Sequence, residues 1–299
     1  MDFTIRLGLA AAATAILLAG CAATPTPQRG AAQSVRADRQ IEAQASAFEA
    51  FMRNARAIDD KFSGPAAVNE GLRVGAAYDP KQMEAGMIAY AAVAALQDPK
   101  FVAGVRKAGK DGQLAKRLVA RPDLATTLPG ADSGAARANA ALYRQGEALN
   151  ASGLRVKKVS YSVQHQAWSQ VFVPDAKARL TRVKQISSAG YRPVAGDEAR
   201  LYAAVSDSGR RGGPASPVVT RGLAVAALTV LGDGSKAKSL LNEPKSGMCL
   251  RVAKLNLYQC LASAGPYYED IYCLAMHGMM EPSSCATKAS GAPIRTAQR

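Results

Sequence analysis

The sequence CLRVAKLNLYQCLASAGPYYEDIYCLAMHGMMEPSSC, residues 249–285, decides the fold of the C-terminal part of the chain. Its first half repeats apolar residues every three to four positions, which is the spacing of one face of an α-helix. The dipeptide Gly265-Pro266 ends that helix and starts a second one, which runs through Tyr267 to about His277. The segment therefore predicts a helical hairpin. The apolar positions of its first helix are Leu250, Ala253, Leu257, Leu261 and Ala264.

Four cysteines lie in this segment, and helix geometry selects how they pair. Cys249 and Cys260 are eleven residues apart, so they lie on one helix face about 16 Å apart and cannot bond to each other. In an antiparallel hairpin, Cys260 and Cys273 lie about 8 and 11 Å from the turn. Cys249 and Cys285 lie about 24 and 28 Å from it, so the pairs Cys249–Cys285 and Cys260–Cys273 fit, whereas the crossed pairing misses by about 13 Å. Pro282 is expected to interrupt the second helix, which affects the outer pair more than the inner one.

A zinc site with four cysteine ligands is the alternative. Structural zinc sites bring their ligands in pairs two to four residues apart, but here 10, 12 and 11 residues intervene. No Cys-x-x-Cys motif occurs, so the cysteines favour a structural role over a catalytic one. Disulfides persist in oxidising compartments, which favours a location outside the cytoplasm.

The N-terminus has the pattern of an export signal. Residues 7–19 form an apolar run that is too short to remain in a bilayer as a spanning helix. The run ends in Leu18-Ala19-Gly20-Cys21, which resembles the lipobox of bacterial lipoproteins. The resemblance implies that residues 1–20 are a signal peptide and that Cys21 carries the acyl chains that anchor the protein in a membrane. Ala22 favours the outer membrane as the destination, and the inner membrane stays open.

The mature chain divides by composition. Residues 21–37 are rich in proline, glutamine and alanine, which predicts a tether. Residues 206–217, SDSGRRGGPASP, predict a linker or exposed loop between a helical domain at 38–205 and a C-terminal helical unit at 218–285. Residues 286–299 have no apolar pattern, which predicts a disordered tail. The sequence leaves open whether the two helical parts form one domain or two.

Apolar periodicity and capping residues predict helices throughout both parts. Helices are expected to start at Asp79-Pro80, Asp98-Pro99 and Ser216-Pro217, because these side chains accept from the first free amides and proline suits the first helical position. Residues 87–96 are apolar on nearly every face, which predicts a buried core helix. The fold class is all-α, an irregular helical bundle with a C-terminal disulfide-clamped hairpin. The predicted helices are 38–62, 79–96, 98–121, one from Asp132 or Ser133 to about Asn150 with a continuation to Val173 left open, 176–188, 218–231 and 236–241.

The chain is strongly basic. Its formal net charge is +15, from 38 Lys and Arg against 23 Asp and Glu, which favours attraction to polyanions. The predicted compartment excludes nucleic acid as the partner and leaves phospholipid head groups, lipopolysaccharide, wall polymers and acidic proteins. The whole chain has two histidines, which argues against multi-histidine metal sites.

No catalytic motif is found in the sequence. HExxH, Gly-x-Ser-x-Gly and a Walker loop do not occur, and no Glu is followed by Ser as in lytic transglycosylases. Other wall hydrolases use two facing carboxylates, and sequence spacing alone does not exclude such a pair. A peptidoglycan hydrolase is therefore the alternative function. We expect no cofactor.

Two short clusters are candidate sites. His165 and Trp168 are expected to share a helix face, either as a binding groove or as a packing pair. Met276, His277 and Met280 combine thioethers with imidazole, which suits Cu(I), although methionines also fill gaps in helical cores. Periplasmic copper binding is therefore the third interpretation.

The segments YSVQHQAWSQVFVP (161–174) and LNLYQCLASAGPYYEDIYC (255–273) resemble stretches of uncharacterised helical envelope proteins of α-proteobacteria. The resemblance implies a helical fold and an envelope location, and no activity. Within the second segment, Tyr267 and Tyr268 are a candidate exposed surface for a partner, and Glu269 and Asp270 suit the start of a helix. We therefore predict a lipid-anchored periplasmic structural or accessory protein that binds an envelope protein or a polyanionic wall component.

Overall fold

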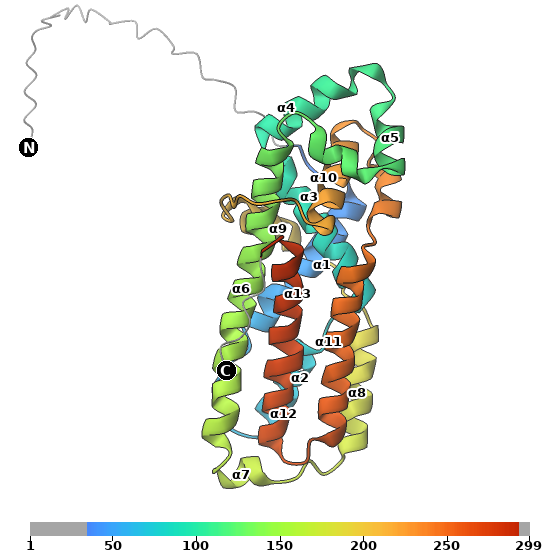
Figure 1. The fold of residues 1–299 in the computed structure, drawn as a ribbon. Helices are drawn as coiled ribbons and strands as arrows, with labels where there is room; N and C mark the ends of the chain where they lie inside the picture. The colour runs from blue at the N-terminus through green and yellow to red at the C-terminus, as the bar shows by residue number, and fades with distance from the viewer. Residues whose placement is uncertain (1–34, 293–299) are drawn as a thin grey trace, which may run out of the picture. The chain divides into compact units, whose positions relative to one another are not determined.

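The computed structural model describes residues 35–292, which are mostly helical (Figure 1). These residues contain no β-strand, and their one isolated bridge joins Phe172 to Pro266. The all-α fold class is confirmed. The predicted signal peptide, the lipidation site Cys21 and most of the predicted tether lie outside the described residues.

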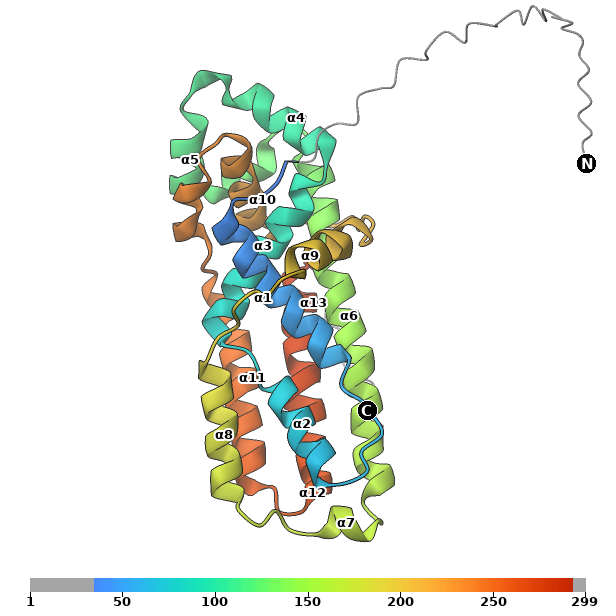
Figure 2. The ribbon, with the colours of Figure 1, turned by 180° about the vertical axis from the view of Figure 1, so that it is seen from behind.

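Helix α3 lies at the centre, and α1, α6, α10 and α11 all pack against it (Figures 1 and 2). Short 3-10 segments cover Gly109–Asp111, Pro122–Thr127 and Gly234–Leu240, and a π-helical segment, Leu274–Met280, joins α12 to α13. The α-helices are α1 (Arg39–Arg56), α2 (Pro65–Gly75), α3 (Pro80–Leu96), α4 (Pro99–Ala108), α5 (Leu114–Ala120), α6 (Ala131–Val163), α7 (Ala167–Gln170), α8 (Ala176–Ser188), α9 (Asp197–Ser206), α10 (Pro217–Val230), α11 (Pro244–Ser263), α12 (Tyr267–Cys273) and α13 (Glu281–Ala289).

Small residues allow close packing around α3. Residues 87–96 are buried throughout, as their uniformly apolar sequence predicts. A Cβ on Gly86 would lie 2.8 Å from the Gln44 carbonyl of α1, and a Cβ on Gly222 of α10 would lie 2.7 Å from the Ala91 side chain. The helices therefore pack backbone to backbone, which is why an alanine- and glycine-rich chain with few aromatic residues has a dense core.

The predicted helix starts at Asp-Pro and Ser-Pro pairs are confirmed. Asp79 accepts from the Gln82 amide at 2.9 Å, and Asp98 accepts from the Phe101 amide at 3.0 Å. Ser216 Oγ accepts from the amide of the third residue after it at 3.1 Å. Each side chain satisfies an amide that the first turn of its helix leaves free. Helix α8 also has the predicted bounds, 176–188.

Several predicted boundaries are wrong. Helix α1 ends at Arg56 instead of residue 62, and the helix predicted at 98–121 is divided into α4 and α5. Helix α6 begins after Gly130, whose φ of 79° suits glycine, and neither Asp132 nor Ser133 caps it. It runs past Asn150 and ends at Val163, so the continuation to residue 173 does not occur. Helices α2 and α9 were not predicted.

The two helical parts share one core, so residues 206–217 are an exposed loop within a single unit. The loop is tied down where the Arg211 amide donates to the Ala136 carbonyl at 2.8 Å and Arg210 pairs with Asp98 at 2.5 Å. The predicted ends of the ordered part also need correction. Ala37, assigned to the tether, is buried. Residues 286–289, assigned to the disordered tail, complete α13. Within the tail so predicted, Ala286, Ala289 and Ala292 are buried.

Among the helices of residues 35–292, none combines the length and the apolar character needed to cross a membrane.

Candidate functional site

The C-terminal hairpin has the predicted disulfides. Cys249 bonds to Cys285 with their Cα atoms 5.9 Å apart, and Cys260 bonds to Cys273 with their Cα atoms 5.6 Å apart. The second helix of the hairpin is interrupted next to Pro282, as predicted, but the helical run does not end there. The chain widens into the π-helical segment just before it and resumes as α13, in whose first turn a proline without an amide hydrogen is tolerated.

The π-helical segment contains the candidate copper residues. His277 Nδ1 lies 2.9 Å from Glu281 Oε1, and that carboxylate also accepts from Asn256 Nδ2 of α11 at 3.1 Å. Met280 packs on α6, where a Cβ on Gly153 would lie 2.6 Å from Met280 Cγ. In residues 35–292, no three His, Cys, Asp or Glu side chains form a group that could hold a metal. The copper interpretation stays a prediction.

His165 and Trp168 do not share a helix face, because α6 ends at Val163 and the chain turns before α7. Trp168 is half-buried and its indole nitrogen donates to Gln166 Oε1 at 2.6 Å, whereas His165 is exposed. The predicted groove or packing pair is therefore wrong, since the helix on which it depended stops two residues too early.

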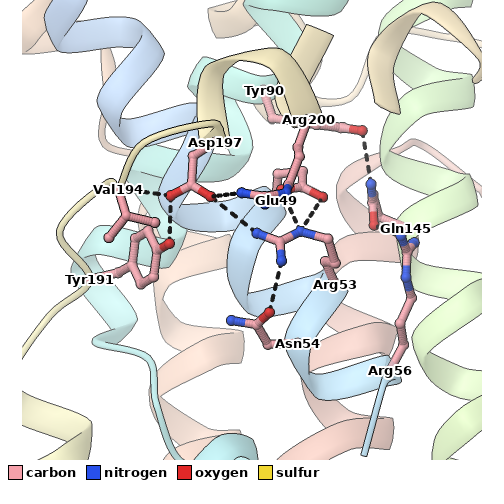
Figure 3. Close-up of polar contacts among 10 residues, drawn as sticks. All are labelled: Glu49, Arg53, Asn54, Arg56, Tyr90, Gln145, Tyr191, Val194, Asp197 and Arg200. Carbon is pink, nitrogen blue, oxygen red and sulfur yellow. Dashed lines mark hydrogen bonds and ion pairs between the residues drawn. The ribbon is translucent and has the colours of Figure 1, made fainter. Parts of the chain in front are cut away.

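Two buried carboxylates that sequence reasoning missed meet around one arginine (Figure 3). Glu49 of α1 and Asp197 of α9 are both about 1% exposed. Arg53 Nε lies 3.2 Å from both oxygens of Glu49, and its Nη2 lies 3.2 Å from Asp197 Oδ1. The two acids are 148 residues apart in the chain, so no local pattern could have paired them.

The electrostatics of this cluster favour an ionised, charge-compensated Asp197. Burial raises the pKa of Asp197, but hydrogen bonds from the Tyr191 hydroxyl and the Val194 amide, with the charge of Arg53, outweigh burial and hold that pKa below its ordinary value. Burial and the bond to Asp197 raise the pKa of Tyr191 to about 12. A general acid needs a raised carboxyl pKa, so this arrangement suits fastening α9 to α1 better than acid catalysis. The peptidoglycan hydrolase alternative stays a prediction.

A second buried ion pair joins α8 to α12. Arg179 Nη1 donates to Asp270 Oδ1 at 2.6 Å, and both side chains are at most 1% exposed. Arg179 Nη2 also donates to the carbonyls of Leu261 and Ala264 at the end of α11. Burial raises the pKa of Asp270 to about 6, against the opposing charge of Arg179. The helix-start interpretation of Asp270 was therefore incomplete.

Lys254 is a buried cation in α11. Its Nζ donates to the Ala76 carbonyl at 2.9 Å and to Ser187 Oγ at 3.2 Å, and lies 3.4 Å from the centre of the Tyr78 ring. Burial lowers the pKa of Lys254 well below its ordinary value, opposed by the charge of Asp79. A lysine beside a serine can activate a nucleophile. Here the Lys254 and Ser187 side chains are both buried, and both donate to the Ala76 carbonyl, which directly follows α2. They therefore link the end of α2 to α8 and α11.

The exposed side of α11 carries an apolar row that sequence reasoning also missed. Met248, Val252 and Leu255 are 55%, 45% and 56% exposed, and their spacing of four and three residues aligns them on one face. We call these three residues the α11 stripe. The periodicity of α11 was interpreted as one core face, so the apolar residues opposite that face drew no attention. Of the predicted tyrosine pair, Tyr267 is buried and Tyr268 is half-buried, so that pair is not the exposed surface expected.

No family model matches the chain, and neither a curated protein nor a solved structure is similar to it.

Proposed function

We propose that the protein is a lipid-anchored accessory protein of the bacterial cell envelope that docks another envelope protein on the α11 stripe. The anchor is Cys21, and the periplasmic face of the outer membrane is the proposed location. The single observation that carries the docking role is the alignment of three half-exposed apolar side chains on one face of α11.

The stripe supplies the apolar centre that protein interfaces have. Each of its side chains keeps about half of its surface in water. Covering that half contributes about 1 kcal/mol per side chain, because fully burying a Val, Leu or Met contributes about 1.5–3 kcal/mol. A partner that covers the whole row therefore gains about 3 kcal/mol, which is the scale of an interface hot spot.

Rigidity of the supporting helix favours binding. Disulfides from Cys249 and Cys260 link α11 to α13 and α12. One of the two cysteines precedes Val252 in α11 and the other follows it. A partner therefore has no helix to order when it binds, which reduces the entropic cost of association.

Charge indicates the chemistry of the partner. Lys245 and Arg251 lie beside the stripe on α11, and the chain has a net charge of +15. An amphipathic helix with an apolar stripe and acidic flanks would match both features. A polyanionic wall polymer matches the charge and leaves the apolar row uncovered, so we favour a protein.

Site-specific photo-crosslinking tests the proposal. A photoreactive residue is placed at Val252 in the full-length protein, in cells that make it natively, and at Val194 as the control. Val194 is 61% exposed but lies in the loop before α9. We expect one protein adduct at Val252, none at Val194, and loss of the Val252 adduct when Leu255→Glu is added. Equal adducts at both positions, or adducts only with wall fragments, would refute docking of a protein on the stripe.

A further inference from the structure

Helices α2 and α8 face each other across a cavity of about 410 Å³. Figure 2 shows α2 and α8 in front of the C-terminal hairpin. The cavity has a packing cause. A Cβ on Gly71 would lie 2.8 Å from Leu274, and a Cβ on Gly75 would overlap the same leucine, so α2 sits close against the π-helical segment. The other side of α2 is separated from α8 by the cavity.

The wall of the cavity is largely apolar. Val183 and Ile186 of α8 face Leu72 of α2, and the stem of Arg179 lies on the same face of α8. Leu72 and Val183 are buried, whereas Ile186 is half-buried. The volume is within the range of about 300–1,000 Å³ that is typical of small-molecule sites.

Three arginines line this apolar cavity, and their charges are compensated unequally. Arg73 pairs with Glu70 at the rim, with bonds of 2.7 and 2.5 Å. Arg179 pairs with Asp270, but its buried Nε has no acceptor among the described residues. Arg182 is exposed and makes no hydrogen bond or ion pair within residues 35–292. The cavity therefore has one uncompensated positive charge and one unused buried donor.

We propose that this cavity binds a small amphiphile with a single anionic group, whose charge pairs with Arg182 and whose apolar part packs against Leu72, Val183 and Ile186. One negative charge balances Arg182, whereas a second would find both other arginines already paired. An apolar body is required because a small inorganic anion would leave the apolar wall in contact with water. This site is separate from the α11 stripe, so it does not depend on the proposed function.

Calorimetric titration with decanoate, below its micelle concentration, tests the proposal on residues 34–299, which include the whole described unit. Decanol and decyltrimethylammonium have the same chain with no charge and with a positive charge. We expect decanoate to bind at least fivefold more tightly than either. Arg182→Gln should weaken decanoate binding about fivefold, the scale of one partly exposed ion pair, and Arg182→Lys should restore most of it.

Two further variants provide the controls. Arg106→Gln on α4 removes the same charge away from the cavity and should bind decanoate like the wild type. Ile186→Trp fills the cavity, so we expect binding to fall more than tenfold. Circular dichroism on each variant establishes that it is folded.

Three outcomes would overturn the proposal. They are equal binding of decanol and decanoate, equal loss of affinity in Arg182→Gln and Arg106→Gln, and binding of acetate as tight as that of decanoate. Competition between decanoate and phosphatidylglycerol vesicles then identifies the source. Competition supports a bilayer lipid as the donor of the amphiphile, and its absence supports a free carboxylate.

Discussion

The Arg179–Asp270 pair allows a quantitative test, because both side chains are buried and only the aspartate can lose its charge by titration. Arg179→Met leaves the Asp270 carboxylate buried without its cation, and Asp270→Asn leaves a buried guanidinium. Each single substitution should lower the free energy of unfolding by about 3–5 kcal/mol at pH 7. Arg179→Met combined with Asp270→Leu removes both charges, so its free energy of unfolding should lie within about 1 kcal/mol of the wild-type value.

The pH dependence separates the two single variants. An aspartate without its cation can take up a proton, whereas arginine does not lose one in proteins. The cost of Arg179→Met should therefore shrink as the pH falls from 7 to 5, and the cost of Asp270→Asn should not shrink in the same way. In the wild type, burial raises the folded-state pKa of Asp270 to about 6. The unfolded value is about 3.9, so the folded state binds more protons between these two pKa values. This group therefore lowers stability by about 3 kcal/mol as the pH rises from well below about 4 to well above about 6.

The assay is urea unfolding of residues 34–299 with intact disulfides, followed by circular dichroism at pH 4.5, 5.5 and 7. The relevant quantity is the difference between the wild-type and Asp270→Asn pH profiles, because this difference cancels the other titrating groups. Parallel profiles would contradict the raised pKa. A double variant that costs as much as the sum of Arg179→Met and Asp270→Leu, each measured singly, would refute the coupling between Arg179 and Asp270.

Three other perturbations have defined outcomes. Cys21→Ser should move the protein from the membrane fraction to the soluble fraction of cell extracts, and persistence in membranes after a high-salt wash would contradict lipid anchoring. Gly104→Ala should lower stability by about 3 kcal/mol, measured by thermal unfolding, because the new methyl group would overlap the Pro129 carbonyl. The control Gly212→Ala, with open space around it, should change stability by less than about 0.5 kcal/mol. Because burial lowers the folded-state pKa of Lys254, the unfolded chain binds more protons above that pKa, so stability should rise with pH up to about 10. Lys254→Met should lack that rise in urea unfolding.

Features determined by neighbouring residues could be predicted from the sequence. Asp79, Asp98 and Ser216 each cap a helix through an amide three residues away, which is a local interaction. The disulfide pairing was predictable too, because the regular rise of a helix converts residue spacing into distance. The all-α class follows from the same kind of pattern.

Features that depend on distant neighbours could not be predicted. Helix α2 contains Gly71 and Gly75, which weaken an isolated helix, and it is stabilised by close contact with Leu274 about 200 residues later. The Glu49–Arg53–Asp197 cluster likewise joins α1 to α9, although Glu49 and Asp197 are 148 residues apart in the sequence. The form of the interruption next to Pro282 could not be predicted, because the π-helical segment that precedes the proline leaves no signal in apolar spacing.

The nested disulfides have a topological consequence for proteolysis. The turn at residues 264–266 lies inside both covalent loops, since Cys260 joins Cys273 and Cys249 joins Cys285 around it. A protease that cuts one peptide bond in this turn would leave the two products linked twice, so the C-terminal fragment would not be shed. Separation would require reduction of both bridges, and a nicked molecule would migrate as one species on a non-reducing gel and as two on a reducing gel.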